Sequence, residues 1–301
     1  MNKQKIIIIA GPTGVGKTAL SIEVAKKFNC EIVSADSIQI YKKLDIGSAK
    51  VTEKEKDGIV HHLIDIVETS QNFSAGDYVR LAEEAINKII KKGKTPLIVG
   101  GTGMYIQSLL FEIGAQCGKD EEYRKELQQL AEEKGSEHLH KMLEKIDKES
   151  AEKIHPNHLP RIIRALEIYH LTGKPKSEQK NATESKYDYL LFGLTAEREV
   201  LYQRINTRVD KMIDSGLLNE VQELINQGIT LENQCMQGIG YKEPYMFLTG
   251  QISREEFIEL LKQNSRHYAK RQLTWFRSMP NVIWKTYDQK EEIFDLIEKF
   301  I

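Results

Sequence analysis

A glycine-rich turn near the N-terminus carries the residue types that bind phosphate. It fits the pattern G-x-x-x-x-G-K-[ST], and it follows a run of isoleucines and precedes a helical repeat. The turn consists of Gly11, Pro12, Thr13, Gly14, Val15, Gly16, Lys17 and Thr18. In such a turn, backbone N–H groups and a helix N-terminus face phosphate oxygens, Lys17 neutralises charge, and the Thr18 hydroxyl is a candidate Mg²⁺ ligand. The turn therefore predicts a site for a nucleotide or another diphosphate.

An acid follows the second apolar run of the chain. ATPases and GTPases with such a phosphate loop also need an acid at the end of a buried strand, which helps to hold Mg²⁺. The apolar run at 97–99 leads instead into Gly-Gly-Thr-Gly at 100–103, whereas Asp36 follows the run at 30–35. Asp36 is a candidate Mg²⁺ ligand or a base that faces an acceptor. These features alone leave a small-molecule kinase and other transferases open.

Cations are concentrated in three places. Residues 260–287 contain six cations and no acid, namely Lys262, Arg266, Lys270, Arg271, Arg277 and Lys285. Tyr268, Trp275 and Phe276 are interleaved with them, and such a face suits RNA as well as an ordinary solvated helix. The second cluster is Arg161, Arg164 and Lys174. The third is Arg204 and Arg208, four residues apart on an expected helix, where both are candidates to reach a diphosphate.

The order of apolar patterns predicts a three-layer α/β domain with a parallel sheet. Short buried-strand signatures occur at 5–10, 30–37, 95–103, 187–195 and 281–285. Helical patterns alternate with them, and Ser74 with Asp77 predicts a capping box at the start of one helix. Residues 116–186 interrupt this alternation with a charged, mostly helical pattern, which predicts a helical insertion between core segments 1–115 and 187–301. The polar stretch 171–188 is expected to be the return linker.

Composition limits the remaining possibilities. The 43 Lys and Arg against 44 Asp and Glu give a net charge of -1, which neither supports nor excludes a nucleic-acid partner. Cys30, Cys117 and Cys235 are too widely spaced for a zinc knuckle or a disulfide framework. The adjacent His61 and His62 with Asp65 resemble metal ligands, but neighbouring side chains point in different directions, so structural roles are expected. We expect a cytoplasmic protein without a membrane span.

Several segments together resemble one family. GPTGVGKT, DSIQIYKKLDIGSAK, VGGTGMYIQSL, RVDKMIDSGLLNEV, QGIGYKE and RQLTWFR occur in the order and spacing of the bacterial tRNA dimethylallyltransferases. The resemblance covers nearly the whole chain. It implies a core similar to P-loop NTPases, and transfer of a dimethylallyl group from dimethylallyl diphosphate to tRNA. The acceptor is the exocyclic amine of the adenosine 3′ of the anticodon, in tRNAs that read codons beginning with U.

The resemblance also implies residue roles. Asp36 is the base that takes the proton of the acceptor amine, Thr102 lies close to the acceptor base, and Lys17, Thr18 with Mg²⁺, and Arg208 hold the diphosphate. The tRNA-binding residues are expected to be Asp36, Ser37, Ile38, Gln39, Thr102, Arg124, Arg161, Arg164, Gly240 and Lys242. The insertion is expected to contact the anticodon stem-loop, and the enzyme to act as a monomer.

Alternatives from other classes remain open at this stage. A phosphate-loop kinase uses the same turn and Asp36 but makes no use of the cationic segments. Prenylation of free adenine nucleotides needs no RNA-binding surface. A non-enzymatic RNA-binding module leaves Lys17 and Asp36 without a role. Measured binding to tRNA separates the first two from the tRNA prenyltransferase.

Overall fold

The protein consists of two compact units. The computed structural model describes residues 3–111, 118–179 and 184–301. One unit, here called the α/β unit, comprises Met1–Leu110 with Lys186–Ile301, and the other, the helical unit, comprises Phe111–Ser185. The boundary expected at 115–116, Cys117 and residues 180–183 of the expected linker lie outside the described residues. Each unit is described by itself.

A parallel sheet forms the centre of the α/β unit. It contains six strands in the order β3-β2-β4-β1-β5-β6, and every pairing between them is parallel. The strands are β1 (Gln4–Ala10), β2 (Cys30–Ala35), β3 (His61–His62), β4 (Thr95–Gly100), β5 (Tyr187–Leu194) and β6 (Val282–Lys285). Helices cover the sheet, so the predicted α/β fold with a parallel sheet is confirmed.

Strand β1 shows why this sheet is buried on both faces. Ile6, Ile7, Ile8 and Ile9 are all 0% exposed. Because side chains alternate along a strand, Ile7 and Ile9 share one core with helices α1 (Lys17–Lys27) and α13 (Lys290–Phe300), while Ile6 and Ile8 face the opposite side. Each buried isoleucine stabilises the fold by about 1.5–3 kcal/mol. The central strand therefore holds the phosphate-loop turn, which begins at its carboxyl end, on a rigid base.

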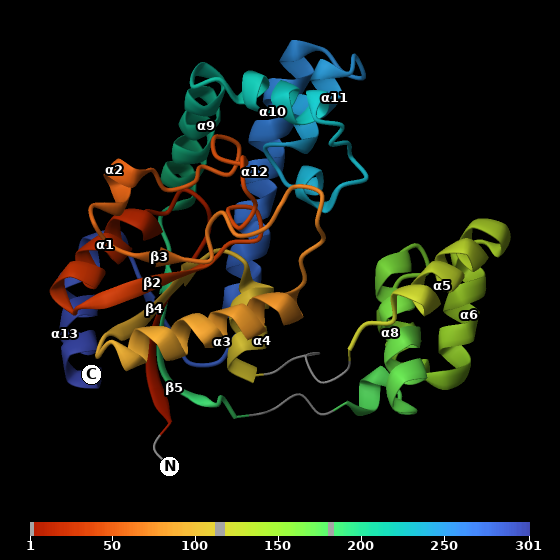
Figure 1. Cartoon of the computed structure of the whole chain (residues 1–301), viewed down its shortest axis with the longest axis horizontal. Coiled ribbons are helices and arrows are strands. Elements are labelled where there is room, and N and C mark those ends of the chain that lie inside the picture. The colour runs from red at the N-terminus through yellow and green to blue at the C-terminus, as the bar shows by residue number, and fades with distance from the viewer. Residues whose placement is uncertain (1–2, 112–117, 180–183) are drawn as a thin grey trace. The chain divides into compact units, whose positions relative to one another are not determined.

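The helices of the α/β unit occupy both sides of the sheet, with α1 and α13 lying together, away from α3 and α4 (Figure 1). Helix α3 starts with the predicted capping box, in which Ser74 and Asp77 exchange hydrogen bonds with each other's backbone. The helices are α1 (Lys17–Lys27), α2 (Glu53–Lys56), α3 (Ala75–Lys91), α4 (Gly103–Phe111), α9 (Arg198–Asp214), α10 (Leu217–Asn226), α11 (Lys242–Leu248), α12 (Arg254–Arg277) and α13 (Lys290–Phe300), with short 3-10 turns η2 (Gln234–Gln237) and η3 (Tyr287–Gln289).

The described part of the helical unit contains four α-helices and one 3-10 turn. They are α5 (Glu121–Lys134), α6 (Ser136–Ile146), α7 (Lys148–Lys153), α8 (Leu159–Thr172) and η1 (Lys176–Glu178). Leu139, Leu143 and Ile162 are 0% exposed and lie in a core of their own. The polar stretch from 171 is less irregular than expected, because α8 continues to Thr172 and η1 follows. No helix among the described residues is long and apolar enough to cross a membrane.

Candidate active site

The predicted phosphate loop connects β1 to α1. Gly16 is the N-cap of α1 and has φ 101°, a left-handed conformation that favours glycine. Lys17 Nζ donates to the carbonyl oxygens of Gly11 (2.9 Å) and Pro12 (2.8 Å), so its ammonium lies directly over the loop. Burial and the nearby Arg208 lower the pKa of Lys17 to about 8, although Asp36 raises it. The loop therefore places a concentrated positive charge at the start of a helix, as an anion requires.

Arg208 of α9 adds a second cation to this loop. Its Nη1 donates to Thr13 Oγ1 (3.1 Å) and its Nη2 donates to Ala49 O (3.4 Å). Within the described ranges, no ion pair joins Arg208 to an acid. Burial lowers the pKa of the guanidinium, which still remains charged at neutral pH. Arg204, expected beside it, is exposed and lines neither of the two cavities at this loop.

Asp36 follows β2 on the same edge of the sheet. Its Oδ1 accepts hydrogen bonds from the backbone N–H groups of Ile38 (2.9 Å) and Gln39 (3.2 Å), which fixes the orientation of the carboxylate. Its other oxygen, Oδ2, accepts none of the hydrogen bonds found among the described residues. The charge of Asp36 raises the pKa values of Lys17 and Arg208, so the three groups are electrostatically close. One carboxylate oxygen is thus available beside two cations.

Two cavities meet at the phosphate loop. One has a volume of about 330 Å³ and is lined by Asp36, by residues 37–39 and by the polar side of α12. The other has a volume of about 860 Å³ and is lined by the start of α1 and by residues 45–52. Lys17, Thr18 and Arg208 line both cavities. The cationic groups therefore lie where the two cavities adjoin.

The Thr18 side chain is the predicted Mg²⁺ ligand. No group of three or more His, Cys, Asp or Glu side chains that could enclose a metal ion exists in the described part of the chain. Mg²⁺ usually keeps several water molecules and binds through few protein oxygens together with substrate phosphates. One hydroxyl that lines both cavities next to Lys17 fits that mode of binding. The residues present therefore suit a Mg²⁺ ion that arrives with a diphosphate.

Gln272 of α12 holds the phosphate loop against the turn after β4. Its Oε1 accepts from Thr13 N (2.9 Å), and its Nε2 donates to Gly101 O (2.9 Å). The side chain is only 6% exposed. We did not predict this residue from the sequence, because a glutamine within a cationic helix gives no signal of a contact 259 residues away. Its position explains how the loop, β4 and α12 are kept in one arrangement.

The other predicted residues of the α/β unit differ in position. Ser37, Ile38, Gln39 and Gly240 line the smaller cavity. Thr102 adjoins it, because Thr102 Oγ1 accepts from Ser37 N (3.1 Å). In contrast, the side chain of Lys242 is exposed at the start of α11 and lines no described cavity. The geometry thus brings together the acid, the 37–39 turn and Thr102, but not Lys242.

The six cations of 260–287 also separate into two groups. Lys262 pairs with Asp210 (2.7 Å), Arg266 donates to Asn206 (2.7 Å), and Lys285 pairs with Glu292. Arg271 lies 5.6 Å from the ring centre of Tyr268, and both line the smaller cavity. Trp275 is 39% exposed, whereas Phe276 is buried. Three of these six cations are therefore used within the fold, and the other three, all on α12, lie near Asp36 or in solvent.

In the helical unit, a buried acid organises two of the three predicted arginines. Glu167 is 0% exposed and accepts from Arg124 Nε (2.7 Å), Arg124 Nη2 (2.8 Å), Arg164 Nη1 (2.5 Å) and Asp120 N (2.9 Å). Burial alone would raise the pKa of Glu167, but these hydrogen bonds lower it below its ordinary value. Arg161 is exposed. We did not predict Glu167 from the sequence, although its spacing of three from Arg164 was a possible signal.

His61 and His62 have structural contacts, as expected. His61 Nδ1 lies 2.9 Å from Ile59 O, and His62 Nε2 lies 2.8 Å from Glu31 Oε2. Glu31 also pairs with Lys92 and Lys94, and these contacts, against the effect of burial, lower its pKa to about 2. The histidine pair forms the short edge strand β3, which we did not predict. These residues anchor the sheet and lie apart from the cavities at the phosphate loop.

Comparison with known proteins identifies a family. The model of the IPP transferase family matches residues 39–279. The tRNA dimethylallyltransferase of Geobacillus thermodenitrificans is 50% identical over 299 residues, which are 98% of this chain and 95% of that protein. The tRNA dimethylallyltransferase of Bacillus anthracis is 48% identical over 300 residues, which are 99% of this chain and 95% of that protein.

Solved structures agree with these relatives. The tRNA isopentenylpyrophosphate transferase of Bacillus halodurans has 45% identity and a TM-score of 0.74, with 99% of this chain and 96% of that chain covered. A eukaryotic dimethylallyltransferase acting on tRNA has 33% identity and a TM-score of 0.84, with 99% of this chain and 80% of that chain covered.

Proposed function

The chain belongs to the IPP transferase family and is an enzyme that transfers a prenyl group to tRNA, and we propose which groups react. The donor is dimethylallyl diphosphate. The acceptor is the exocyclic amine of the adenosine 3′ of the anticodon, in tRNAs that read codons beginning with U. A bond forms between the amine nitrogen and the allylic carbon, the bond from that carbon to the bridging oxygen breaks, and diphosphate leaves.

The observation that carries this proposal is the arrangement of charges at the two cavities. Lys17, Arg208 and the backbone of the phosphate loop stabilise the negative charge that grows on the leaving diphosphate. Arg208 has only neutral hydrogen-bond partners among the described residues, so its charge is available to an anion. Bound Mg²⁺ at Thr18 would supply further neutralisation of the diphosphate.

Asp36 acts at the acceptor. The exocyclic amine of adenine is a poor nucleophile, because its lone pair is delocalised into the ring. Asp36 accepts the amine proton, and the two hydrogen bonds to its Oδ1 hold the carboxylate in place. General-base assistance of this kind typically contributes about 10²–10⁴-fold. The turn at 37–39 and Thr102 lie next to Asp36 and line the space for the base, which must leave the stack of the anticodon loop to enter.

Cations supply the sequence-independent part of tRNA binding. Arg271 beside the smaller cavity, and Arg124, Arg161 and Arg164 of the helical unit, are the groups we assign to the phosphates of the anticodon stem-loop. We propose that Glu167 holds Arg124 and Arg164 in fixed orientations on the surface that binds the RNA. Gly240 contributes to the cavity wall, whereas the exposed Lys242 is proposed to contact the tRNA outside the cavity. The active species is proposed to be a monomer.

A labelling experiment tests the proposal. The protein is incubated with Mg²⁺, radiolabelled dimethylallyl diphosphate and undermodified tRNA, and the labelled nucleotide is then located by digestion. Label is expected at the adenosine 3′ of the anticodon and is expected to disappear when that adenosine is replaced by guanosine. A tRNA that reads codons beginning with another base is the second control. Label elsewhere in the tRNA, or in free adenine nucleotides only, would overturn the proposed acceptor.

A further inference from the structure

Residues 44–50, here called segment 44–50, separate the two cavities of the active site. Gly47 and Ser48 line the smaller cavity with Asp36, whereas Asp45, Ile46, Ala49 and Lys50 line the larger one with Thr18. The segment contains turns but no helix or strand. Two internal backbone hydrogen bonds, from Ala49 N to Ile46 O and from Lys50 N to Asp45 O, shape the turn but do not attach it to the sheet. The groups that hold the segment therefore determine the shape of both cavities.

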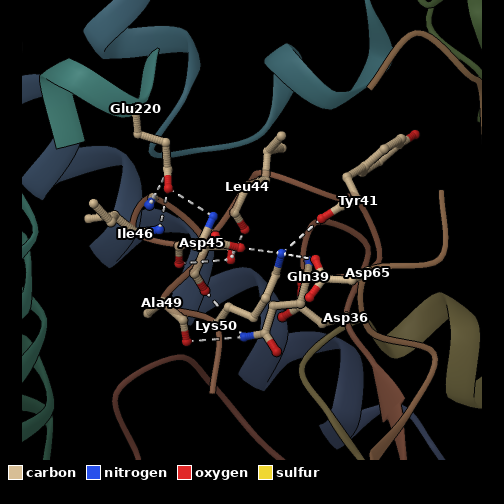
Figure 2. A network of polar contacts seen from close by, with 12 residues as sticks. Asp36, Gln39, Tyr41, Leu44, Asp45, Ile46, Ala49, Lys50, Asp65 and Glu220 are labelled. Atoms are coloured by element: carbon tan, nitrogen blue, oxygen red, sulfur yellow. Dashed lines mark hydrogen bonds and ion pairs between the residues drawn. The ribbon is translucent and has the colours of Figure 1, made fainter. Parts of the chain in front are cut away.

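Glu220 of α10 holds one side of this segment. Its Oε2 accepts from Asp45 N (3.0 Å) and Ile46 N (2.8 Å), and its Oε1 accepts from Gly47 N (3.1 Å). Figure 2 shows the Glu220 carboxylate directed at this turn, on the opposite side from Lys50 and Gln39. One carboxylate that accepts three successive backbone N–H groups forms strong, charge-assisted hydrogen bonds. The Glu220 carboxylate thus accepts hydrogen bonds from successive N–H groups of segment 44–50, as a bound anion does in a backbone nest.

Tyr241 completes this attachment. Its hydroxyl donates to Glu220 Oε1 (2.8 Å) and accepts from Ser48 N (3.2 Å), so four consecutive backbone N–H groups are satisfied by two side chains. Burial and the neighbouring Glu220 hold the pKa of Tyr241 well above its ordinary value, which keeps the hydroxyl protonated as a donor. A Cβ on Gly47 would come within 2.7 Å of both Gly240 O and Tyr241 Cζ. The segment is therefore packed directly on the residues before α11.

The other side of segment 44–50 contacts the reacting groups. Its carbonyl oxygens accept from Gln39 Nε2, at Ser48 O (3.2 Å) and Ala49 O (3.3 Å), and from Arg208 Nη2, at Ala49 O (3.4 Å). Lys50, whose side chain is 6% exposed, donates to Tyr41 O (2.9 Å) and pairs with Asp45 (2.6 Å) and Asp65. A displacement of the segment would therefore move partners of Arg208 and Gln39 together.

We infer that Glu220 is a positioning residue for the reaction: through segment 44–50 it fixes Arg208 toward the diphosphate and Gln39 toward the acceptor base. The inference rests on the proposed function, because it assumes that the diphosphate is held by Lys17 and Arg208. Glu220 touches neither Arg208 nor Gln39, so its effect passes through the backbone of segment 44–50. A shift of about 1 Å in a positioning group is sufficient to reduce turnover substantially.

The test measures binding of inorganic diphosphate with Mg²⁺ by calorimetry to the full chain. In Glu220→Gln, an amide NH₂ replaces one acceptor oxygen and faces a backbone N–H or the Tyr241 hydroxyl, which disturbs the segment. We expect diphosphate to bind roughly tenfold more weakly. Tyr241→Phe, which keeps the ring against Gly47, is expected to weaken binding in the same direction and to a smaller degree. Glu223→Gln is the matched control, because Glu223 is exposed one turn away on α10 and its side chain forms no hydrogen bond or ion pair with the segment among the described residues, although it lines a shallow hollow beside Asp45 and Ile46.

A double-mutant cycle distinguishes positioning from a general loss of stability. In an Arg208→Ala background, Glu220→Gln is expected to weaken diphosphate binding further by less than about twofold, because the group that it positions is gone. Fully additive effects, or wild-type affinity in Glu220→Gln, would overturn the inference. If Glu220→Gln does not unfold cooperatively, the same cycle is measured with Tyr241→Phe in the wild-type and Arg208→Ala backgrounds. The additivity of those two effects on diphosphate binding then decides the inference. Failure of the wild-type protein to bind diphosphate would instead contradict the proposed function.

Discussion

Two acids, the half-buried Asp36 of the α/β unit and the buried Glu167 of the helical unit, have opposite surroundings. In the α/β unit, Asp36 uses Oδ1 for two backbone N–H groups, while Oδ2 accepts no hydrogen bond from the described residues. In the helical unit, both oxygens of Glu167 are occupied, by Arg124, Arg164 and Asp120 N. The arginines of the two units differ in the same way. Arg208 donates hydrogen bonds to neutral oxygens only, whereas Arg124 forms an ion pair with the Glu167 carboxylate.

This difference distinguishes groups held ready for a ligand from groups that maintain a fold. Removing a charged group from water costs free energy. A charged group that lines a cavity and has a hydrogen-bonding atom unused by the protein is therefore a candidate to bind a ligand. A buried carboxylate that is fully paired contributes mainly to structure and becomes strongly destabilising when one partner is removed. We therefore expect substitutions at Asp36 to affect kinetics and substitutions at Glu167 to affect folding.

The largest effect is expected for Asp36→Asn. The amide oxygen can still accept from Ile38 N and Gln39 N, so the turn should persist, but the amide cannot take up a proton. Turnover measured with labelled dimethylallyl diphosphate is expected to fall by about 10²–10⁴-fold, with little change in diphosphate affinity or melting temperature. Asp57→Asn, a substitution of an exposed acid, is the control. Turnover close to that of the wild type would remove Asp36 as the base.

An intermediate effect, on stability, is expected for Glu167→Gln. The amide NH₂ faces Arg124 or Arg164, and the free energy of unfolding of the helical unit is expected to fall by about 3 kcal/mol. Both tryptophans, Trp275 and Trp284, lie in the α/β unit. Helix content followed by circular dichroism should therefore decrease at lower denaturant concentration than in the wild type, whereas tryptophan fluorescence should not change its midpoint. Unfolding midpoints that equal those of the wild type, by both circular dichroism and fluorescence, would contradict the structural role assigned to Glu167.

The smallest effect concerns the pH dependence of anion binding. Because the pKa of Lys17 is about 8 in the folded protein, its charge is lost as the pH rises through that value. Affinity for diphosphate is expected to fall by up to about fivefold between pH 8 and 9, following the loss of one bound proton. Lys17→Arg, which stays charged, is expected to show a flatter profile whatever its affinity at pH 7. An equally steep decrease in that variant would exclude Lys17 as the source.

Local patterns predicted much of the fold, for physical reasons that the residues make clear. Four consecutive isoleucines before a glycine-rich turn indicate a strand buried on both faces, and β1 is such a strand. Ser74 and Asp77 form the predicted capping box, since its geometry depends on only four residues. The short strand β3 was missed because two histidines carry no hydrophobic periodicity.

The site was less predictable where it depends on distant pairs. The phosphate loop and Asp36 are recognisable because one short motif and one strand end contain the signal. Gln272 contacts Thr13, and Glu220 contacts residues 45–47, across more than 170 positions of the chain. No spacing rule links such residues, since helix packing in three dimensions decides which of them meet. The partner of Arg124 was hidden for the same reason, being 43 positions away.

The most direct experiment determines whether the phosphate loop binds the leaving diphosphate of the prenyl donor or binds ATP. Purified protein, Mg²⁺, dimethylallyl diphosphate and undermodified tRNA are combined without ATP, and prenylated tRNA and released diphosphate are counted in the same sample. We expect one diphosphate to be released for each prenyl group attached, and no change when ATP is added at a concentration equal to that of the donor. A requirement for ATP, or hydrolysis of ATP coupled to the transfer, would contradict this expectation.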